Sequence, residues 1–155
     1  MLGGAELKQR VLPAVLAGER IAALAITEPS GGSDVSALRC TAVREGDHYV
    51  VNGEKTFITS GIRADYLTVA VRTDPRAEGA RGISLLLVEG DTQGLSRTPL
   101  RKMGWWASDT AHLRFDNCRV PAGHLLGTEG TGFRAIMQNF NSGRFSMAAG
   151  AIGFA

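Results

Sequence analysis

Short apolar runs separated by turn residues fill the chain between residues 21 and 126, and none of them shows helical periodicity. Gly46-Asp47 and Asn52-Gly53 are hairpin signals, the second being the strongest two-residue signal of this kind. Many short strands at regular spacing favour an antiparallel barrel or sandwich. The strands are predicted over residues 38–44, 48–51, 55–59, 66–71, 83–88, 95–101 and 111–115.

Helical periodicity is confined to the two ends of the chain. Apolar residues recur every three to four positions over residues 5–17, which predicts a helix that Pro13 interrupts. A second helix is expected over residues 130–155, where one apolar stripe comprises Phe133, Ile136, Met137 and Phe140. The expected fold class is therefore mainly β, with terminal α-helices.

Size and composition exclude several classes of protein. A chain of 155 residues forms one domain that buries roughly 70% of its unfolded surface. A formal charge of +2 favours neither nucleic acid nor an anionic membrane, and no apolar run reaches the ~20 residues of a membrane span. Cys40 and Cys118 lack CxxC spacing, which favours buried free thiols in a reducing compartment. The three histidines lack metal-ligand spacing, so no metal site is expected.

The segment most informative for function, residues 25–37, is an apolar strand that runs into a turn containing Gly31-Gly32. Adjacent glycines let backbone N–H groups face a ligand without a Cβ in the way. Thr27 and Ser33 add hydroxyl donors, so the segment suits a phosphate and the polar edge of a ring. Glu28 and Asp34 are expected to accept backbone N–H bonds and fix the loop, rather than to act as an acid/base pair.

Thr27-Glu28-Pro29 and Gly32-Ser33-Asp34 together resemble the T-E-P-x-x-G-S-D signature of the flavin-dependent acyl-CoA dehydrogenases. Further matches cover nearly the whole chain: Asn52-Gly53-x-Lys55-x-Phe57-Ile58-Thr59-x-Gly61, Met103-Gly104-x-x-x-Ser108-Asp109-Thr110, Val120-Pro121, Gly130-x-Gly132-Phe133 and Asn141-x-x-Arg144. The resemblance implies the end of an N-terminal helical domain (1–20), a middle β-domain that binds flavin and acyl-CoA (21–127), and the start of a C-terminal helical domain (128–155). The full-length protein would be α+β, and the chain is expected to be a fragment of it.

The same resemblance implies FAD as the cofactor. Thr27 and its backbone would lie at the flavin N1/O2 edge, Ile26 would offer its carbonyl to N3, and Thr59 would donate towards N5. Phe57 would stack on the flavin face away from the substrate, where many relatives carry Trp. Gly32 and Ser33 would hold the pyrophosphate. The implied cofactor-binding set is Leu24, Ala25, Ile26, Thr27, Gly32, Ser33, Phe57, Ile58 and Thr59.

Acyl-CoA is the implied substrate, with Ser33, Asn141 and Arg144 lining its site. Asn141 stands where the D-x-x-R element of the family has its aspartate, so the usual ion pair becomes a neutral hydrogen bond. In most of the family the base is a glutamate of the C-terminal domain. In a minority it directly precedes the arginine, where this chain has Gly143. Either the base lies beyond Ala155 or the chain is catalytically dead. We expect the first, with no catalytic residue in this chain.

The implied activity is oxidation of an acyl-CoA to the trans-2-enoyl-CoA, by removal of the α-proton and transfer of the β-hydride to flavin N5. The resemblance also implies an electron-transfer flavoprotein as acceptor and a homodimer or homotetramer when full length. The location would be the cytoplasm of a bacterium or the mitochondrial matrix of a eukaryote, and the fragment alone would be inactive. The alternatives are an acyl-CoA oxidase or flavin monooxygenase of the same fold, and a non-enzymatic β-barrel interaction module.

Overall fold

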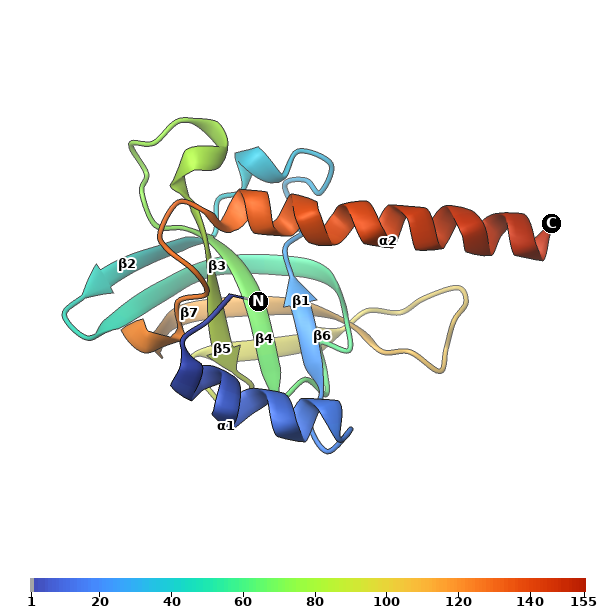
Figure 1. The fold of residues 1–155 in the computed structure, drawn as a ribbon, viewed down its shortest axis with the longest axis horizontal. Helices are drawn as coiled ribbons and strands as arrows, with labels where there is room; N and C mark the ends of the chain where they lie inside the picture. Colours follow the sequence, from blue (N-terminus) through green and yellow to red (C-terminus); the bar gives the residue numbers. More distant parts are fainter. Residues whose placement is uncertain (1) are drawn as a thin grey trace.

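A curled β-sheet with a helix from each end of the chain packed against it makes up the fold (Figure 1). The computed structural model describes residues 2–155. The strands are β1 (Ala22–Ala25), β2 (Thr41–Glu45), β3 (His48–Thr59), β4 (Tyr66–Arg72), β5 (Ile83–Glu89), β6 (Leu95–Pro99) and β7 (Thr110–Pro121). The helices are α1 (Ala5–Leu16), α2 (Gly132–Phe154) and the short 3-10 helices η1 (Val35–Ala37), η2 (Gly79–Gly82) and η3 (Ala122–His124).

The sheet runs in the order β1-β4-β2-β3-β7-β6, and β5 pairs with β4. The pairs β2–β3, β3–β7, β4–β5 and β6–β7 are antiparallel, which confirms the predicted mainly β class. The topology departs from the expectation in its details. β1 and β2 each lie parallel to β4, and three short 3-10 helices occur between the terminal helices of the described chain. β1 and β4 can pair in parallel because the chain between them, residues 26–65, returns to the same end of the sheet before β4 begins.

β3 is one long strand, so the predicted hairpin at Asn52-Gly53 is wrong. The register with β7 passes from Val51↔Cys118 to Gly53↔Phe115, which places an extra residue on β7 at this point. Asn52 Oδ1 accepts a hydrogen bond from Asn117 N at 2.8 Å, and this bond holds the irregularity. A Cβ on Gly53 would lie 2.7 Å from Cys40 Cα. Glycine is therefore required here by a close backbone approach rather than by a turn.

Strand β5 is apolar along its whole length because both of its faces are covered. Leu86 and Val88 lie in the main core inside the curled sheet. Ile83 and Leu85 on the other face pack with Ile136 of α2. The next outward residue, Leu87, packs with Leu7 and Val11 of α1 instead. The two terminal helices therefore share one strand as their contact surface.

Helix α1 continues through Pro13, contrary to the predicted interruption. A proline within a helix removes one backbone donor, and here the contacts of Leu7 and Val11 with Leu87 hold the helix on the sheet. Arg10 adds polar contacts, donating to His124 Nε2 at 2.6 Å and pairing with Glu89 at 2.9 Å.

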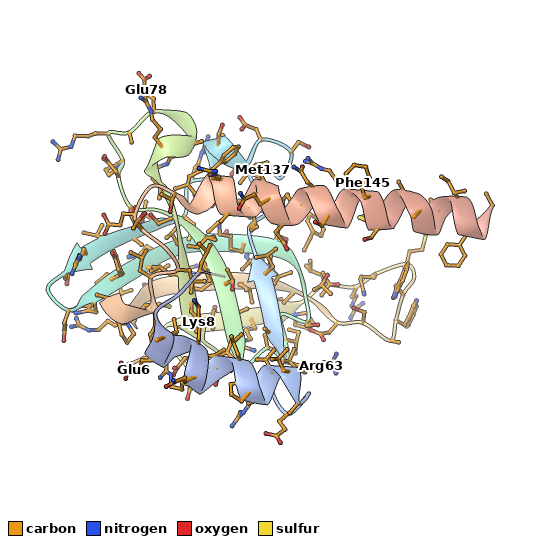
Figure 2. All side chains as sticks on the ribbon, viewed as in Figure 1. Glu6, Lys8, Arg63, Glu78, Met137 and Phe145 are labelled. Atoms are coloured by element: carbon orange, nitrogen blue, oxygen red, sulfur yellow. The ribbon has the colours of Figure 1, made fainter. Side chains whose placement is uncertain are left out.

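Helix α2 covers the sheet only with its first turns. The predicted stripe is packed, with Ile136 buried and Phe133, Met137 and Phe140 partly buried against the sheet. Farther along, Figure 2 shows Met137 where α2 crosses the sheet and Phe145 beyond its edge. The large apolar residues exposed on this second half are Phe145, Met147, Ile152 and Phe154. None of the helices described over residues 2–155 is long and apolar enough to cross a membrane.

The first testable prediction concerns His124, which links α1 to β5. Arg10 can only donate, so His124 Nε2 accepts and Nδ1–H donates to the Leu87 carbonyl at 3.0 Å. Burial and then the Arg10 charge lower the pKa of His124 below 6.5, although the Leu87 bond and Glu89 oppose them. The unfolded chain therefore binds a proton that the folded chain resists, and stability should fall as the pH drops below 6.5.

Urea unfolding midpoints between pH 7.5 and 5.5 test this expectation. His124→Gln keeps a polar side chain but removes the titrating group, so its midpoint should fall less steeply with decreasing pH. Parallel slopes for the two proteins would show that His124 does not contribute.

Candidate functional site

The turn after β1 is shaped by close contact between Thr27 and Gly32. Glu28 and Gly31 bond each other through their backbones, with Glu28 N to Gly31 O at 3.1 Å and Gly31 N to Glu28 O at 3.0 Å. A Cβ on Gly32 would lie 2.8 Å from Thr27 Cγ2, so only glycine leaves room for the threonine. Ser30 to Asp34, Ala37 and Leu38 line a cavity of about 210 Å3 beside the turn. The predicted glycine-rich segment thus forms a small concave surface.

Both carboxylates of the turn have the predicted loop-fixing role. Glu28 Oε2 accepts from Arg39 N at 2.7 Å and Glu28 Oε1 from Cys40 N at 2.8 Å. Asp34 Oδ1 accepts from Ser36 N at 3.0 Å at the start of η1. Burial alone would raise the pKa of Glu28, but the Lys55 ammonium and the two backbone donors outweigh it and hold the pKa below 4.5. Glu28 is therefore an ionised anchor.

Lys55 is the residue whose role the sequence analysis missed. Its side chain is fully buried, and its Nζ donates to Glu28 Oε1 at 2.9 Å and to the Ile26 carbonyl at 3.0 Å. Lysine is almost never fully buried unless it is paired. The sequence shows a single lysine within an otherwise strand-like motif. That pattern does not predict which residue pairs with the lysine.

The end of β3 carries Phe57 and Thr59 on an irregular stretch. The register with β7 passes from Lys55↔Leu113 to Ile58↔Ala111, so β3 contains one extra residue there. Phe57 has φ 57, a conformation that is uncommon for any residue but glycine. As a result Ile58 is buried while Phe57, 70% exposed, and Thr59 face solvent on either side of it. Residues in such sparsely populated backbone conformations cluster at functional sites.

Backbone bonding joins these two regions. Thr56 N donates to the Thr27 carbonyl at 2.8 Å, beside the Lys55 contacts to Ile26 and Glu28. The structure therefore places the segment of Thr27, Gly32 and Ser33 next to the segment of Phe57 and Thr59. That the hydroxyls of Thr27 and Thr59 reach the same ligand stays a prediction.

The other expected cofactor residues differ in what they can offer. Ala25, Ile26 and Ile58 are buried in the core, so only their backbones could reach a ligand. The Ile26 carbonyl, expected to bond the flavin, already accepts from Lys55 Nζ. Leu24 is 39% exposed on the outer side of β1.

Of the expected substrate residues, Ser33 lies in the turn after β1, whereas Asn141 and Arg144 lie on α2. Asn141, Gly143 and Arg144 are all exposed, and a Cβ on Gly143 would meet nothing within 4 Å. No residue of α2 is acidic. Among residues 2–155, no group of three or more His, Cys, Asp or Glu side chains could hold a metal ion. Cys40 and Cys118 are both free and buried, as expected.

Comparison with known proteins identifies the family. The model of the acyl-CoA dehydrogenase middle domain matches residues 23–118. The chain belongs to the acyl-CoA dehydrogenase family. It is 43% identical, over 97% of its length and 36% of the relative, to a mitochondrial isobutyryl-CoA dehydrogenase of Dictyostelium discoideum.

Two further relatives agree with this assignment. A cyclohexane-1-carbonyl-CoA dehydrogenase of Geobacter metallireducens is 43% identical over 99% of this chain and 40% of its own. A crystal structure of a probable acyl-CoA dehydrogenase from Mycobacterium abscessus is 51% identical, with a TM-score of 0.89 over 92% of this chain and 38% of that one. The chain thus spans 36% to 40% of the length of these curated relatives.

Proposed function

We propose that this chain is the flavin-binding part of an FAD-dependent acyl-CoA dehydrogenase. Residues 21–127 would be its middle β-domain, residues 1–20 the end of an N-terminal helical domain and residues 128–155 the start of a C-terminal one. The observation that carries the proposal is the junction of two segments: the turn in which Gly32 makes room for Thr27, and the end of β3 that exposes Phe57. The Thr56–Thr27 backbone bond holds the two segments together.

The residues at this junction fit FAD. The turn at Gly32 and Ser33 lines the cavity beside it and offers backbone N–H groups and a hydroxyl for the pyrophosphate. The exposed Phe57 ring offers an apolar face for stacking, and Thr27 and Thr59 offer hydroxyls for the polar edge of the flavin. When bound, FAD would supply the hydride acceptor for oxidation of the acyl-CoA to the trans-2-enoyl-CoA.

The remaining parts of the proposal concern substrate, base and partners. Asn141 and Arg144 are free to contact an acyl-CoA because both are exposed on α2. Since α2 has no acidic residue and Gly143 cannot act as a base, we assign the base to a part of the protein outside these residues. Transfer of electrons to an electron-transfer flavoprotein, assembly as a homodimer or homotetramer, and a reducing compartment are proposed from the family.

The proposed function is tested on the intact purified protein. We expect bound FAD, visible as its absorbance, and bleaching of that absorbance when an acyl-CoA is added without oxygen. Hydrogen peroxide formed in proportion to substrate in air would instead indicate an oxidase. A protein that retains no FAD would contradict the proposal and support the non-enzymatic module.

The second testable prediction concerns Ser33. Ser33→Ala should weaken FAD binding because it removes a hydroxyl bond to a charged phosphate, worth about 1.5–3 kcal/mol, or roughly a 10- to 150-fold rise in Kd. Titration of the apoprotein with FAD measures the change. Ser96→Ala is the control, because Ser96 is an exposed serine on β6, where it pairs with Arg114 outside the expected cofactor-binding set. An equal effect from both variants would contradict the role assigned to Ser33.

A further inference from the structure

Lys55 and Glu28 form a buried ion pair directly behind the candidate site. Lys55 is 0% exposed and Glu28 is 4% exposed. A buried ion pair is weak evidence of stability, because the cost of removing both charges from water often exceeds their attraction. The pair is therefore better explained by the geometry that it specifies than by the stability that it adds.

The Glu28 carboxylate joins the beginning of the turn to the residues that follow it. Its two oxygens accept from the backbones of Arg39 and Cys40, eleven and twelve residues farther along the chain. The segment that contains Gly32 and Ser33 lies between these anchor points. A shift of the Glu28 carboxylate would therefore move both ends of the turn.

Lys55 connects that anchored turn to strand β3. Its Nζ donates to the Ile26 carbonyl at 3.0 Å and to Glu28 Oε1 at 2.9 Å. Lys55 therefore binds the two residues that flank Thr27. On its own strand, Lys55 directly precedes the irregular stretch of Phe57 and Thr59. The Lys55 ammonium group thus fixes the position of Thr27 relative to the exposed end of β3.

We propose that Lys55 is a positioning residue of the flavin site, which acts by holding Ile26 and Glu28 against β3 and without touching the cofactor. This inference rests on the proposed function, because the site that Lys55 positions is the one assigned to FAD. Its effect should appear in FAD affinity and in the spectrum of bound flavin beyond any effect on folding.

Three variants of the intact protein separate positioning from folding. Lys55→Met removes the ammonium and leaves Glu28 buried without its partner. Lys55→Met/Glu28→Gln removes both charges while an amide retains hydrogen-bonding capacity at Glu28. Tyr49→Phe is the matched control at the start of the same strand, since it removes the hydroxyl bond from buried Tyr49 to Glu129, which is not among the contacts of Lys55 or Glu28. The melting temperature of each apoprotein, its Kd for FAD and the absorbance bands of the bound flavin are measured.

We expect Lys55→Met to lower the melting temperature and to raise the Kd for FAD at least tenfold. The double variant should regain much of the melting temperature, because no buried charge is left unpaired, yet keep the raised Kd and shifted flavin bands. Tyr49→Phe should lower the melting temperature with an unchanged Kd. If Lys55→Met fails to fold, the Kd and flavin bands of the double variant test the inference by themselves.

Two outcomes overturn the inference in distinguishable ways. A double variant that binds FAD like the wild-type protein, or Kd values that follow melting temperature across all variants, shows that Lys55 serves folding only, while the proposed function stands. A wild-type protein that binds no FAD removes the proposed function and this inference together.

Discussion

Thr59→Ala is expected to leave FAD bound and to slow the acyl-CoA-dependent bleaching of flavin absorbance by one to three orders of magnitude. Thr59 is exposed at the end of β3, one residue beyond buried Ile58, so its hydroxyl is available to a ligand. Loss of one donor aimed at charge that develops during reaction costs roughly 2–4 kcal/mol in comparable sites. Stopped-flow absorbance measures the rate, and the flavin-to-protein ratio measures retention.

Thr98→Ala is the control for this experiment. Thr98 is an exposed threonine on strand β6, where it pairs with His112, and it lies outside the expected cofactor-binding set. We expect its bleaching rate to match that of the wild-type protein. If Thr59→Ala also bleaches at the wild-type rate, Thr59 has no role in the reaction.

Leu113→Ala should cause a large loss of stability. Leu113 is fully buried in the main core and lies opposite Lys55 in the pairing of β7 with β3. Replacing a buried leucine with alanine costs about 2–5 kcal/mol, because apolar contact is lost and a cavity remains. For a domain of this size the melting temperature should fall by roughly 4–20 °C.

Val43→Ala provides the comparison, because Val43 is 59% exposed on β2. Its change in stability should stay within about 0.5 kcal/mol. Differential scanning calorimetry of the two variants measures the contrast. Similar melting temperatures for both would mean that the interior of the curled sheet contributes far less than its burial indicates.

Local patterns predicted most of the elements. Alternation of buried Ala111, Leu113 and Phe115 was readable in the sequence, and β7 contains these residues with their side chains inside. The two-residue connection Gly46-Asp47 was also readable, because Glu45 pairs with His48 across it. These features depend on residues close together in the chain, where side-chain period and turn preference act directly.

Asn52-Gly53 shows where local preference fails. The dipeptide favours a hairpin in isolation, but pairing of β3 with β7 along both sides of it, and the close approach of Gly53 to Cys40, keep the strand continuous. The apolar run of β5 was likewise recognisable as a strand. That two helices from opposite ends of the chain cover its outer face was not.

The sequence by itself determined the family, the mainly β class, the terminal helices and the loop-fixing role of Glu28 and Asp34, because motifs and periodicities are properties of neighbouring residues. Only the tertiary structure decided that Lys55 is buried against Ile26 and Glu28, and that one extra residue in β3 turns Phe57 outward. Lys55 is 27 residues from Glu28 along the chain. Such partners meet only when the sheet curls and excludes water, because a buried ammonium group is costly unless a carboxylate pairs with it.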